Sequence, residues 1–248
     1  MASSESIIEE NSTALQNLAK KVVALDALYN VRECMLADKG MMLVALDLSG
    51  AEAYLVFCYS KDWERAKRLE RGEDIHRLHA KEFFNVPRLD LVTPEQRKTA
   101  KNLTYASFYE ASVRTVVVTY NRDYLIHGQR TTEREVKRVQ EVLFDLHLLR
   151  EWWATVRDEL ERNGGWTRNC SGYQRMFRSP YEHERVKAAL ANYPQSTVAW
   201  KMNEAYVRLH DEVDTEGEIE ILHQNHDEFV LECLPEFLER AVVGVEKT

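Results

Sequence analysis

The chain has 248 residues, of which 44% are hydrophobic and 30% charged, and its formal net charge is −8. This length and composition predict a folded chain with a sizeable hydrophobic core and exclude a chain that is mainly disordered. A membrane span is not expected, because the sequence has no run of about 18 apolar residues.

Cysteine usage and the N-terminal sequence indicate the compartment. The four cysteines lie far apart, without the paired spacing of a zinc site or a disulfide framework, and predict buried thiols in a reducing cell interior. The first ten residues are acidic and lack a basic segment, so no signal peptide is expected.

The first predicted elements surround Asp47. Residues 1–20 are expected to be a loose start that runs into a short helix. Residues 41–46 form a continuous apolar run ending at Asp47, a pattern typical of a central buried strand. After a tight turn, the apolar residues of segment 51–59 predict the start of a helix.

The middle of the chain is predicted to be helical. Helices are expected around residues 74–84 and 93–109, and the second begins with Thr93-Pro94-Glu95-Gln96, a capping box with proline in the first turn. Residues 131–162 predict one long amphipathic helix that ends before an Asn-Gly-Gly sequence.

A helix and a hairpin are predicted in the last third of the chain. Residues 181–210 have a helical pattern. Residues 218–224 and 229–232 predict two strands, and residues 225–228 predict the turn that joins them.

Charge is distributed unevenly along this map. Residues 93–139 contain nine Lys and Arg against five Asp and Glu, whereas the last 48 residues are strongly acidic. A basic helical segment and an acidic strand segment are expected where one part of a protein holds phosphates and the other holds metal ions.

One face of the predicted helix 93–109 carries Arg97, Lys101, Tyr105 and Tyr109 at intervals of four residues. The two cations would present charge to phosphates, and the two rings would present a flat surface to a sugar and a base. The alternative interpretation is a solvated basic turn followed by an aromatic core contact.

Two aspartates are candidate metal ligands. Asp47 ends the predicted strand, and Asp227 lies in the predicted hairpin turn. Carboxylates at strand ends can converge on Mg²⁺, which takes oxygen ligands and substrate phosphates. Alternatively, Asp47 is a helix N-cap and Asp227 a turn residue.

Taken in order, these motifs resemble those of the family A (bacterial polymerase I-like) DNA polymerases. Residues 47–52, Asp-Leu-Ser-Gly-Ala-Glu, resemble the first motif of the family. The stripe on helix 93–109 resembles the second motif, on the nucleotide-binding fingers helix, and residues 224–228, Gln-Asn-His-Asp-Glu, resemble the third. The resemblance is collinear from about residue 29 to about residue 235, with supporting segments at 29–37, 74–80 and 192–197.

The resemblance implies an α+β fold in which an antiparallel palm sheet carries Asp47 and Asp227, with a helical fingers insertion between them. It implies three parts, namely an N-terminal segment with the first palm part (1–60), the fingers helices (61–165) and the second palm part (166–248). No thumb or exonuclease domain is expected within the sequence.

The activity that the resemblance implies is template-directed DNA synthesis, in which a primer 3′-hydroxyl attacks the α-phosphate of a dNTP. Asp47 and Asp227 would bind two Mg²⁺ ions, for which Mn²⁺ is a substitute, and the backbone carbonyl of Leu48 would add a ligand.

The resemblance also implies a set of nucleotide contacts. Arg97 and Lys101 would hold the β- and γ-phosphates, and Lys101 would also donate a proton to the leaving pyrophosphate. Glu52 would crowd the 2′ position of the sugar and exclude ribonucleotides. Tyr105, where many relatives have Phe, implies weak discrimination against dideoxynucleotides, and Tyr109 would stack near the templating base.

Primer and template contacts are implied for residues in the last third of the chain, namely Gln195, Gln224, His226, Glu228 and Arg185. Two residues depart from the pattern of the family. Glu110 follows the second tyrosine, where glycine is usual, and places an acidic side chain where the helix pivots. Gly50 replaces the usual glutamine, or a similar residue, of the first motif.

The expected partners are primer–template DNA and dNTPs, and no membrane. Because the resemblance covers palm and fingers only, we expect a second polypeptide to supply a thumb, an exonuclease or both, or self-association to build the DNA cleft. The implied location is the cytoplasm of a bacterial or phage-infected cell.

Two other functions would share part of this pattern. Single-subunit RNA polymerases share the Arg/Lys/Tyr and His-Asp patterns, but they lack a glutamate at the position of Glu52, which would exclude the 2′-hydroxyl. A polymerase-derived subunit that binds DNA or a replisome partner without catalysis has no physical need for Asp47, Asp227, Arg97 and Lys101 together.

Overall fold

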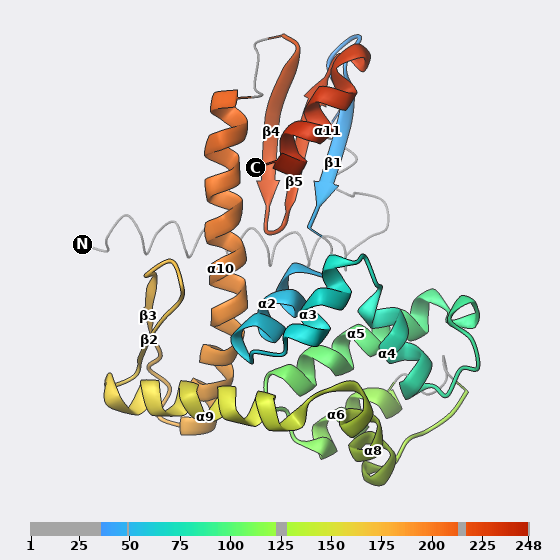
Figure 1. The fold of residues 1–248 in the computed structure, drawn as a ribbon, viewed down its shortest axis with the longest axis vertical. Helices are drawn as coiled ribbons and strands as arrows, with labels where there is room; N and C mark the ends of the chain where they lie inside the picture. Colours follow the sequence, from blue (N-terminus) through green and yellow to red (C-terminus); the bar gives the residue numbers. More distant parts are fainter. Residues whose placement is uncertain (1–35, 49, 123–127, 213–216, 248) are drawn as a thin grey trace. The chain divides into compact units, whose positions relative to one another are not determined.

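The computed structural model describes residues 36–48, 50–122, 128–212 and 217–247, so the helix expected near the N-terminus lies outside the described residues. The fold is α+β, as predicted (Figure 1). The chain divides into two compact units. The described residues of the first unit are 36–46, 208–212, 217–224 and 229–247, and those of the second are the rest of 47–207 together with 225–228.

A three-stranded sheet has the order β1 (Met42–Asp47), β5 (Glu228–Cys233), β4 (Ile219–Asn225). β4 and β5 form the predicted hairpin, with a turn of two residues rather than four, and β1 ends beside the start of β5, so the sheet is antiparallel. The 3₁₀ turn η3 (Pro235–Phe237) and α11 (Leu238–Lys247), which was not predicted, follow β5.

β1 is shifted by one residue from the predicted run 41–46, and its expected central position is wrong. Among the described strands it lies at the edge of the sheet. Its residues alternate between half-buried and exposed, and Leu43 is 38% exposed. A continuous apolar run therefore does not distinguish a central strand from an edge strand whose outer residues are also apolar.

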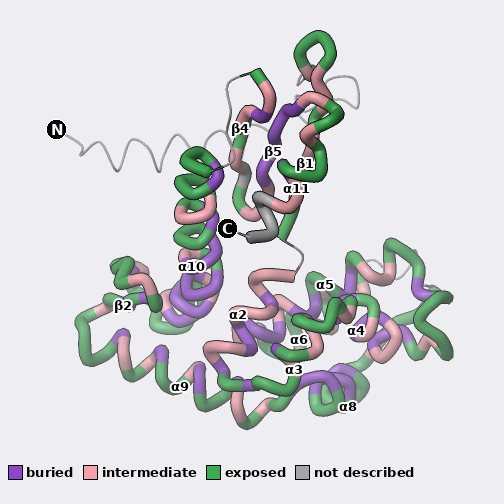
Figure 2. Tube along the Cα trace, turned by 45° about the horizontal axis from the view of Figure 1, so that its top comes forward, coloured by how far each residue is buried: buried purple, intermediate pink, exposed green. Residues whose placement is uncertain are grey.

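The second unit is mainly helical. Its helices are α2 (Ala51–Tyr59), α3 (Trp63–Glu70), α4 (Ile75–Phe83), the 3₁₀ turn η2 (Leu89–Leu91), α5 (Pro94–Phe108), α6 (Val113–Arg122), α8 (Glu133–Leu143), α9 (Leu146–Arg162) and most of α10 (Glu182–Glu212). Figure 2 shows buried residues alternating with exposed ones along α9, as expected for a helix with one face on a core. None of the described helices is long and apolar enough to cross a membrane.

α5 matches its prediction closely. The Thr93 hydroxyl accepts a hydrogen bond from the Gln96 N–H at 3.2 Å, and the Gln96 side chain accepts one from the Thr93 N–H at 3.0 Å. Pro94 occupies the first helical position, where its missing N–H has no helical acceptor. Leu103 and Phe108 are fully buried, and α5 packs against α4. The core therefore fixes which face of α5 stays open.

The prediction of one helix over residues 131–162 is wrong, because the structure has α8 and α9 instead. Phe144 leaves the helical conformation and is 2% exposed. Asp145 then caps α9 by accepting hydrogen bonds from the N–H groups of His147 and Leu148 at 3.1 and 3.2 Å. The burial of Phe144 and this cap outweigh the helical periodicity that continues across the break.

Several elements were not predicted, including α3, α6 and an antiparallel hairpin of β2 (Trp166–Arg168) and β3 (Gln174–Met176). Strands of three residues are too short to show a clear alternation. Cys170 lies in the loop of this hairpin and is exposed, so the prediction of buried thiols is wrong for Cys170, whereas Cys233 is buried. The division into three parts at residues 60 and 165 stays a prediction.

Candidate active site

Asp47 and Asp227 lie close together at the end of β1. The N–H of Leu48 donates to the carbonyl oxygen of Asp227 at 2.8 Å, which joins the two backbones. Partial burial, followed by the negative charges of Asp227 and Glu228, raises the pKa of Asp47, while Lys101 opposes this shift. The two aspartate side chains are therefore near enough to repel each other.

The alternative role of Asp47 as a helix cap is wrong. The N-cap position of α2 is Gly50, and no side chain caps this helix. Gly50 has φ +71°, in the left-handed region that glycine adopts without steric strain. The chain thus turns from β1 into α2 through Gly50 and leaves the Asp47 carboxylate without a capping role. Asp227 does lie in the hairpin turn, after His226, which is exposed and has φ +54°.

Glu52, in the first turn of α2, connects several predicted site residues. The Tyr109 hydroxyl donates to Glu52 Oε2 at 3.5 Å. Burial, followed by the charge of Asp227, raises the pKa of Glu52, whereas Lys101 and hydrogen bonds from Tyr109 and Gln195 act in the opposite direction. Residues from α2, α5, α10 and the hairpin turn therefore meet around one half-buried carboxylate.

Three residues of the predicted stripe, Lys101, Tyr105 and Tyr109, lie next to one another. The rings of Tyr105 and Tyr109 stack with centroids 6.2 Å apart, and Lys101 Nζ lies 5.9 Å from the Tyr105 centroid. Burial, followed by the charge of Glu52, raises the pKa of both tyrosines, so their hydroxyls stay protonated at neutral pH. Both rings also pack against the hydrophobic core, and the Tyr105 ring meets that of Phe108 edge-on with centroids 6.0 Å apart. The alternative of an aromatic core contact therefore describes part of their role, and the nucleotide-binding role of the stripe stays a prediction.

Arg97 is oriented by an acidic side chain that sequence reasoning did not single out. Its Nε lies 2.7 Å from Asp74 Oδ2, and Asp74 also caps α4 by accepting from the Arg77 N–H at 3.0 Å. Burial alone would raise the pKa of Asp74, but the hydrogen bonds and charge of its neighbours, with Arg97 foremost, lower it. Only the resemblance of segment 74–80 to the family pointed to this aspartate.

His76 lies beneath the stripe and was likewise not predicted as a site residue. It is 4% exposed, and its ring centroid is 5.6 Å from that of Tyr105. Burial, followed by the positive charges of Lys101 and Arg97, lowers the pKa of His76 to about 4, so the imidazole is neutral. Its Nδ1 has no hydrogen-bond partner among the described residues.

The remaining predicted residues are spread over the two units. Gln195 lies in α10 of the second unit, Glu228 begins β5, and Gln224 lies in β4 of the first unit. Arg185 donates to the carbonyl oxygen of Ser179 at 2.7 Å, and none of its described contacts joins it to Asp47.

The residues around Asp47 supply only part of the ligand shell that a hard cation needs. Within the described ranges, no group of three or more His, Cys, Asp or Glu side chains is arranged to bind a metal ion. Asp47 and Asp227 supply two carboxylates, so a bound cation would take its other oxygens from the backbone, water or a substrate. Such incomplete protein shells are typical of Mg²⁺ that binds together with phosphates.

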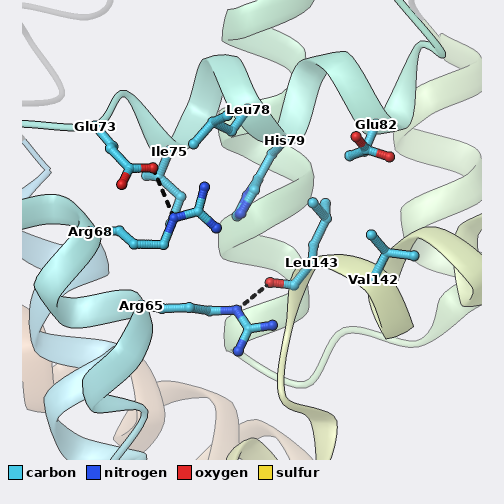
Figure 3. A pocket seen from close by; sticks show the side chains of 9 residues that line it. All are labelled: Arg65, Arg68, Glu73, Ile75, Leu78, His79, Glu82, Val142 and Leu143. Atoms are coloured by element: carbon cyan, nitrogen blue, oxygen red, sulfur yellow. Dashed lines mark hydrogen bonds and ion pairs between the residues drawn. The ribbon is translucent and has the colours of Figure 1, made fainter.

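A separate cavity of about 160 Å³ lies between α3, α4 and the end of α8 (Figure 3). Arg65 Nε donates to the Leu143 carbonyl at 2.7 Å, and Arg68 pairs with Glu73 at 2.8 Å, so both guanidinium groups are engaged (Figure 3). None of the predicted site residues lines this cavity.

Comparison with known proteins is consistent with this arrangement. The family model described as DNA polymerase family A matches residues 6–248. The thermostable DNA polymerase I of Thermus aquaticus is 30% identical over 217 residues, which cover 84% of this chain and 24% of the relative. The DNA polymerase of Mycobacterium phage D29 is 25% identical over 189 residues, which cover 74% of this chain and 28% of the relative.

A solved structure has a similar fold. The POL domain of Pol1 from M. smegmatis, in complex with DNA primer-template and dNTP, superimposes with a TM-score of 0.69 at 25% identity over 88% of this chain and 38% of that chain. This likeness confirms the predicted α+β polymerase fold. The chain spans about a quarter of the length of the curated relatives that it matches.

Proposed function

The chain belongs to DNA polymerase family A, and from this premise we propose that it forms the palm and fingers of a template-directed DNA polymerase. The observation that carries the proposal is the convergence of Asp47, Asp227 and Lys101, whose charges act on one another in the second unit. A metal-dependent nucleotidyl transfer needs acidic and basic groups in this proximity, since cations and triphosphate must meet at one place.

Asp47 and Asp227 are proposed as the ligands of two Mg²⁺ ions, with the Leu48 carbonyl as a further ligand and Mn²⁺ as a substitute. The raised pKa of Asp47 supports this fit, because a bound cation would relieve the repulsion that Asp227 and Glu228 exert on it. When bound, such ions supply an activated 3′-hydroxyl and neutralise charge on the leaving pyrophosphate.

Lys101 and Arg97 are proposed to bind the triphosphate. Lys101 is exposed and lies beside the Tyr105 ring, where its ammonium group can reach a phosphate and donate a proton to the leaving group. The Nε–H of Arg97 donates a hydrogen bond to Asp74. This bond orients the planar guanidinium and leaves its terminal nitrogens directed to other acceptors.

Glu52, Tyr105 and Tyr109 are proposed to recognise the sugar and base. The bond from Tyr109 holds the Glu52 carboxylate in place, where it would exclude a 2′-hydroxyl. The protonated Tyr105 hydroxyl can donate a hydrogen bond where a dideoxynucleotide lacks its own hydroxyl. Gln195, which bonds to Glu52, is proposed as a contact to the primer–template.

The three-part division and the primer–template roles of Gln224, His226, Glu228 and Arg185 stay proposals. The role of each of these four residues is tested by the effect of its alanine substitution on the KM for primer–template. A contact to DNA predicts a raised KM for DNA with little change in the KM for dNTP.

The activity is tested with a primer–template whose next template base is thymine, at DNA concentrations high enough to offset weak binding. Each dNTP is supplied separately with Mg²⁺ or Mn²⁺, alongside rATP. We expect extension with dATP, little with rATP and none with the other dNTPs. DNA binding without any incorporation would contradict the proposal and support the non-catalytic subunit. Preference for rATP would support an RNA polymerase.

The prediction that a second copy or a second polypeptide supplies the thumb is tested in the same assay. The initial rate is followed against the concentration of the chain at fixed DNA. A dependence steeper than first order would indicate a second copy. A co-encoded polypeptide that lowers the DNA concentration required would indicate a separate thumb. Linear dependence that no added polypeptide alters would contradict both.

A further inference from the structure

The C-terminal end of α5 has an unusual residue. Glu110 follows the last turn of α5 with φ +57°, a left-handed conformation that disfavours any residue with a Cβ atom. The N–H of Ala111 donates to the carbonyl of Ala106 at 2.9 Å, and that of Glu110 to Ser107 at 3.4 Å. These two bonds form a Schellman motif, in which glycine normally occupies the position of Glu110.

Two side chains of α9 hold this end of α5. Trp153 Nε1 donates to the Phe108 carbonyl at 2.9 Å, one of the last carbonyls of α5, which has no partner within the helix. Arg157, one turn further along the same face of α9, forms an ion pair with the Glu110 carboxylate. The residues on either side of Tyr109 are therefore both bound to α9.

Tyr109 is the residue through which this contact reaches the proposed nucleotide site. Its hydroxyl donates to Glu52, and its ring stacks on Tyr105. A shift of the chain at Phe108 or Glu110 would move this ring and its hydroxyl. A strained residue that persists where glycine would fit indicates that the side chain is needed.

We propose that Glu110 and Arg157 are positioning residues, whose ion pair holds the end of α5 on α9 and thereby fixes Tyr109 against Glu52 for dNTP binding. This inference rests on the proposed polymerase function. The pair itself is partly exposed, with 32% and 37% of the two side chains accessible, so its contribution to global stability is small. Its effect should appear in nucleotide binding rather than in folding.

The test uses Glu110→Gln, Glu110→Gly, Arg157→Met, the Gln/Met double variant and the charge exchange Glu110→Arg with Arg157→Glu. Arg88→Met, which removes an exposed ion pair with Asp90, is the matched control. For each protein we would measure kcat, the KM for dNTP and the KM for primer–template, and the melting temperature.

Each single variant at the pair is expected to raise the KM for dNTP about 3- to 10-fold with an unchanged KM for primer–template. The double variant should be no worse than either single variant, and the charge exchange should restore most of the loss. Glu110→Gly should behave like Glu110→Gln in KM while its melting temperature stays within about 3 °C of the wild type. The control should change neither KM.

A Glu110→Gly protein with the KM of the wild type, additive effects in the double variant, or no recovery on charge exchange would each overturn the proposal. Failure of the proposed function is recognised separately, because the unmodified chain would then incorporate no nucleotide at all. In that case the positioning role falls with it.

Discussion

The N–H of Leu48 donates to the carbonyl oxygen of Asp227 at 2.8 Å, and this bond brings the end of β1 to the turn between β4 and β5. The bond uses backbone atoms only, and the negative charges of the two aspartate side chains oppose each other. A carboxylate pair held together in this way favours the binding of a cation, because the cation neutralises the repulsion between the two charges.

Divalent cations should therefore stabilise the folded chain. Mg²⁺ or Mn²⁺ is expected to raise the melting temperature, because a ligand that binds only the folded state stabilises it by mass action, and a chelator should reverse the shift. Differential scanning fluorimetry across a Mg²⁺ series measures this. The shift should be lost in Asp47→Asn and kept in Asp90→Asn, which alters an exposed carboxylate. An equal shift in both variants would place the ions elsewhere.

Replacing Glu52 by Ala should relax the choice of sugar. The carboxylate that would crowd a 2′-hydroxyl is removed, and the bond from Tyr109 is lost with it. We expect the preference for dATP over rATP, compared as kcat/KM, to fall about tenfold or more. Glu64→Ala, which removes a carboxylate that is 80% exposed, is the control. An unchanged preference would show that Glu52 does not meet the sugar.

Replacing Tyr105 by Phe should strengthen discrimination against dideoxynucleotides. The Tyr105 hydroxyl is protonated, since burial and Glu52 raise its pKa, and it can donate a hydrogen bond that phenylalanine cannot. The loss of one such bond predicts about a 3- to 10-fold fall in the kcat/KM for ddATP relative to dATP. The ratio is measured by single-nucleotide extension. A fall of equal size for both substrates would assign Tyr105 to packing alone.

Folding stability should fall in weak acid because of a buried histidine. His79 is 2% exposed, and burial, with the charges of His76 and nearby arginines, lowers its pKa to about 3. The unfolded chain binds a proton near pH 6.5 and the folded chain does not, so stability present above pH 6.5 decreases as the pH falls toward 3.

The expected slope is about 1.4 kcal/mol per pH unit for each such histidine, and His76, with a pKa of about 4, adds a second contribution over part of this range. Urea unfolding between pH 7 and pH 4 measures it. His79→Gln should reduce the slope by about 1.4 kcal/mol per pH unit, because one group that titrates only in the unfolded chain is removed. The glutamine amide retains a donor for the Thr104 hydroxyl, which lies 2.7 Å from His79 Nδ1. An identical slope in the variant would show that His79 does not carry the effect.

Sequence patterns were sufficient to predict features that depend only on residues close together in the chain, such as helix caps and the faces of a helix. The cap at Thr93 and the four-residue stripe of α5 depend on neighbouring residues, and both are present in the structure. The approach of Asp47 and Asp227 was predicted through the order of three motifs, since no local pattern connects residues so far apart in the chain.

Long-range contacts were beyond such reasoning. The break between α8 and α9 depends on where Phe144 finds a buried site, and the periodicity alone continues through it. The bonds from Asp74 to Arg97 and from Arg157 to Glu110 join separate helices, so they appear only when the helices are packed. Glu110 was visible as a departure from the family, but its ion-pair partner was not.

The most direct test of this account compares two conservative substitutions in primer extension, Asp227→Asn in the hairpin turn and Asp211→Asn at the exposed end of α10. Each removes one negative charge and keeps the shape of the side chain. We predict that Asp227→Asn lowers the rate of dNTP incorporation about 100-fold or more, because a carboxylate ligand of the proposed ions is lost, and that Asp211→Asn leaves the rate within about twofold. Equal rates in the two variants would contradict the assignment of Asp227 to the active site.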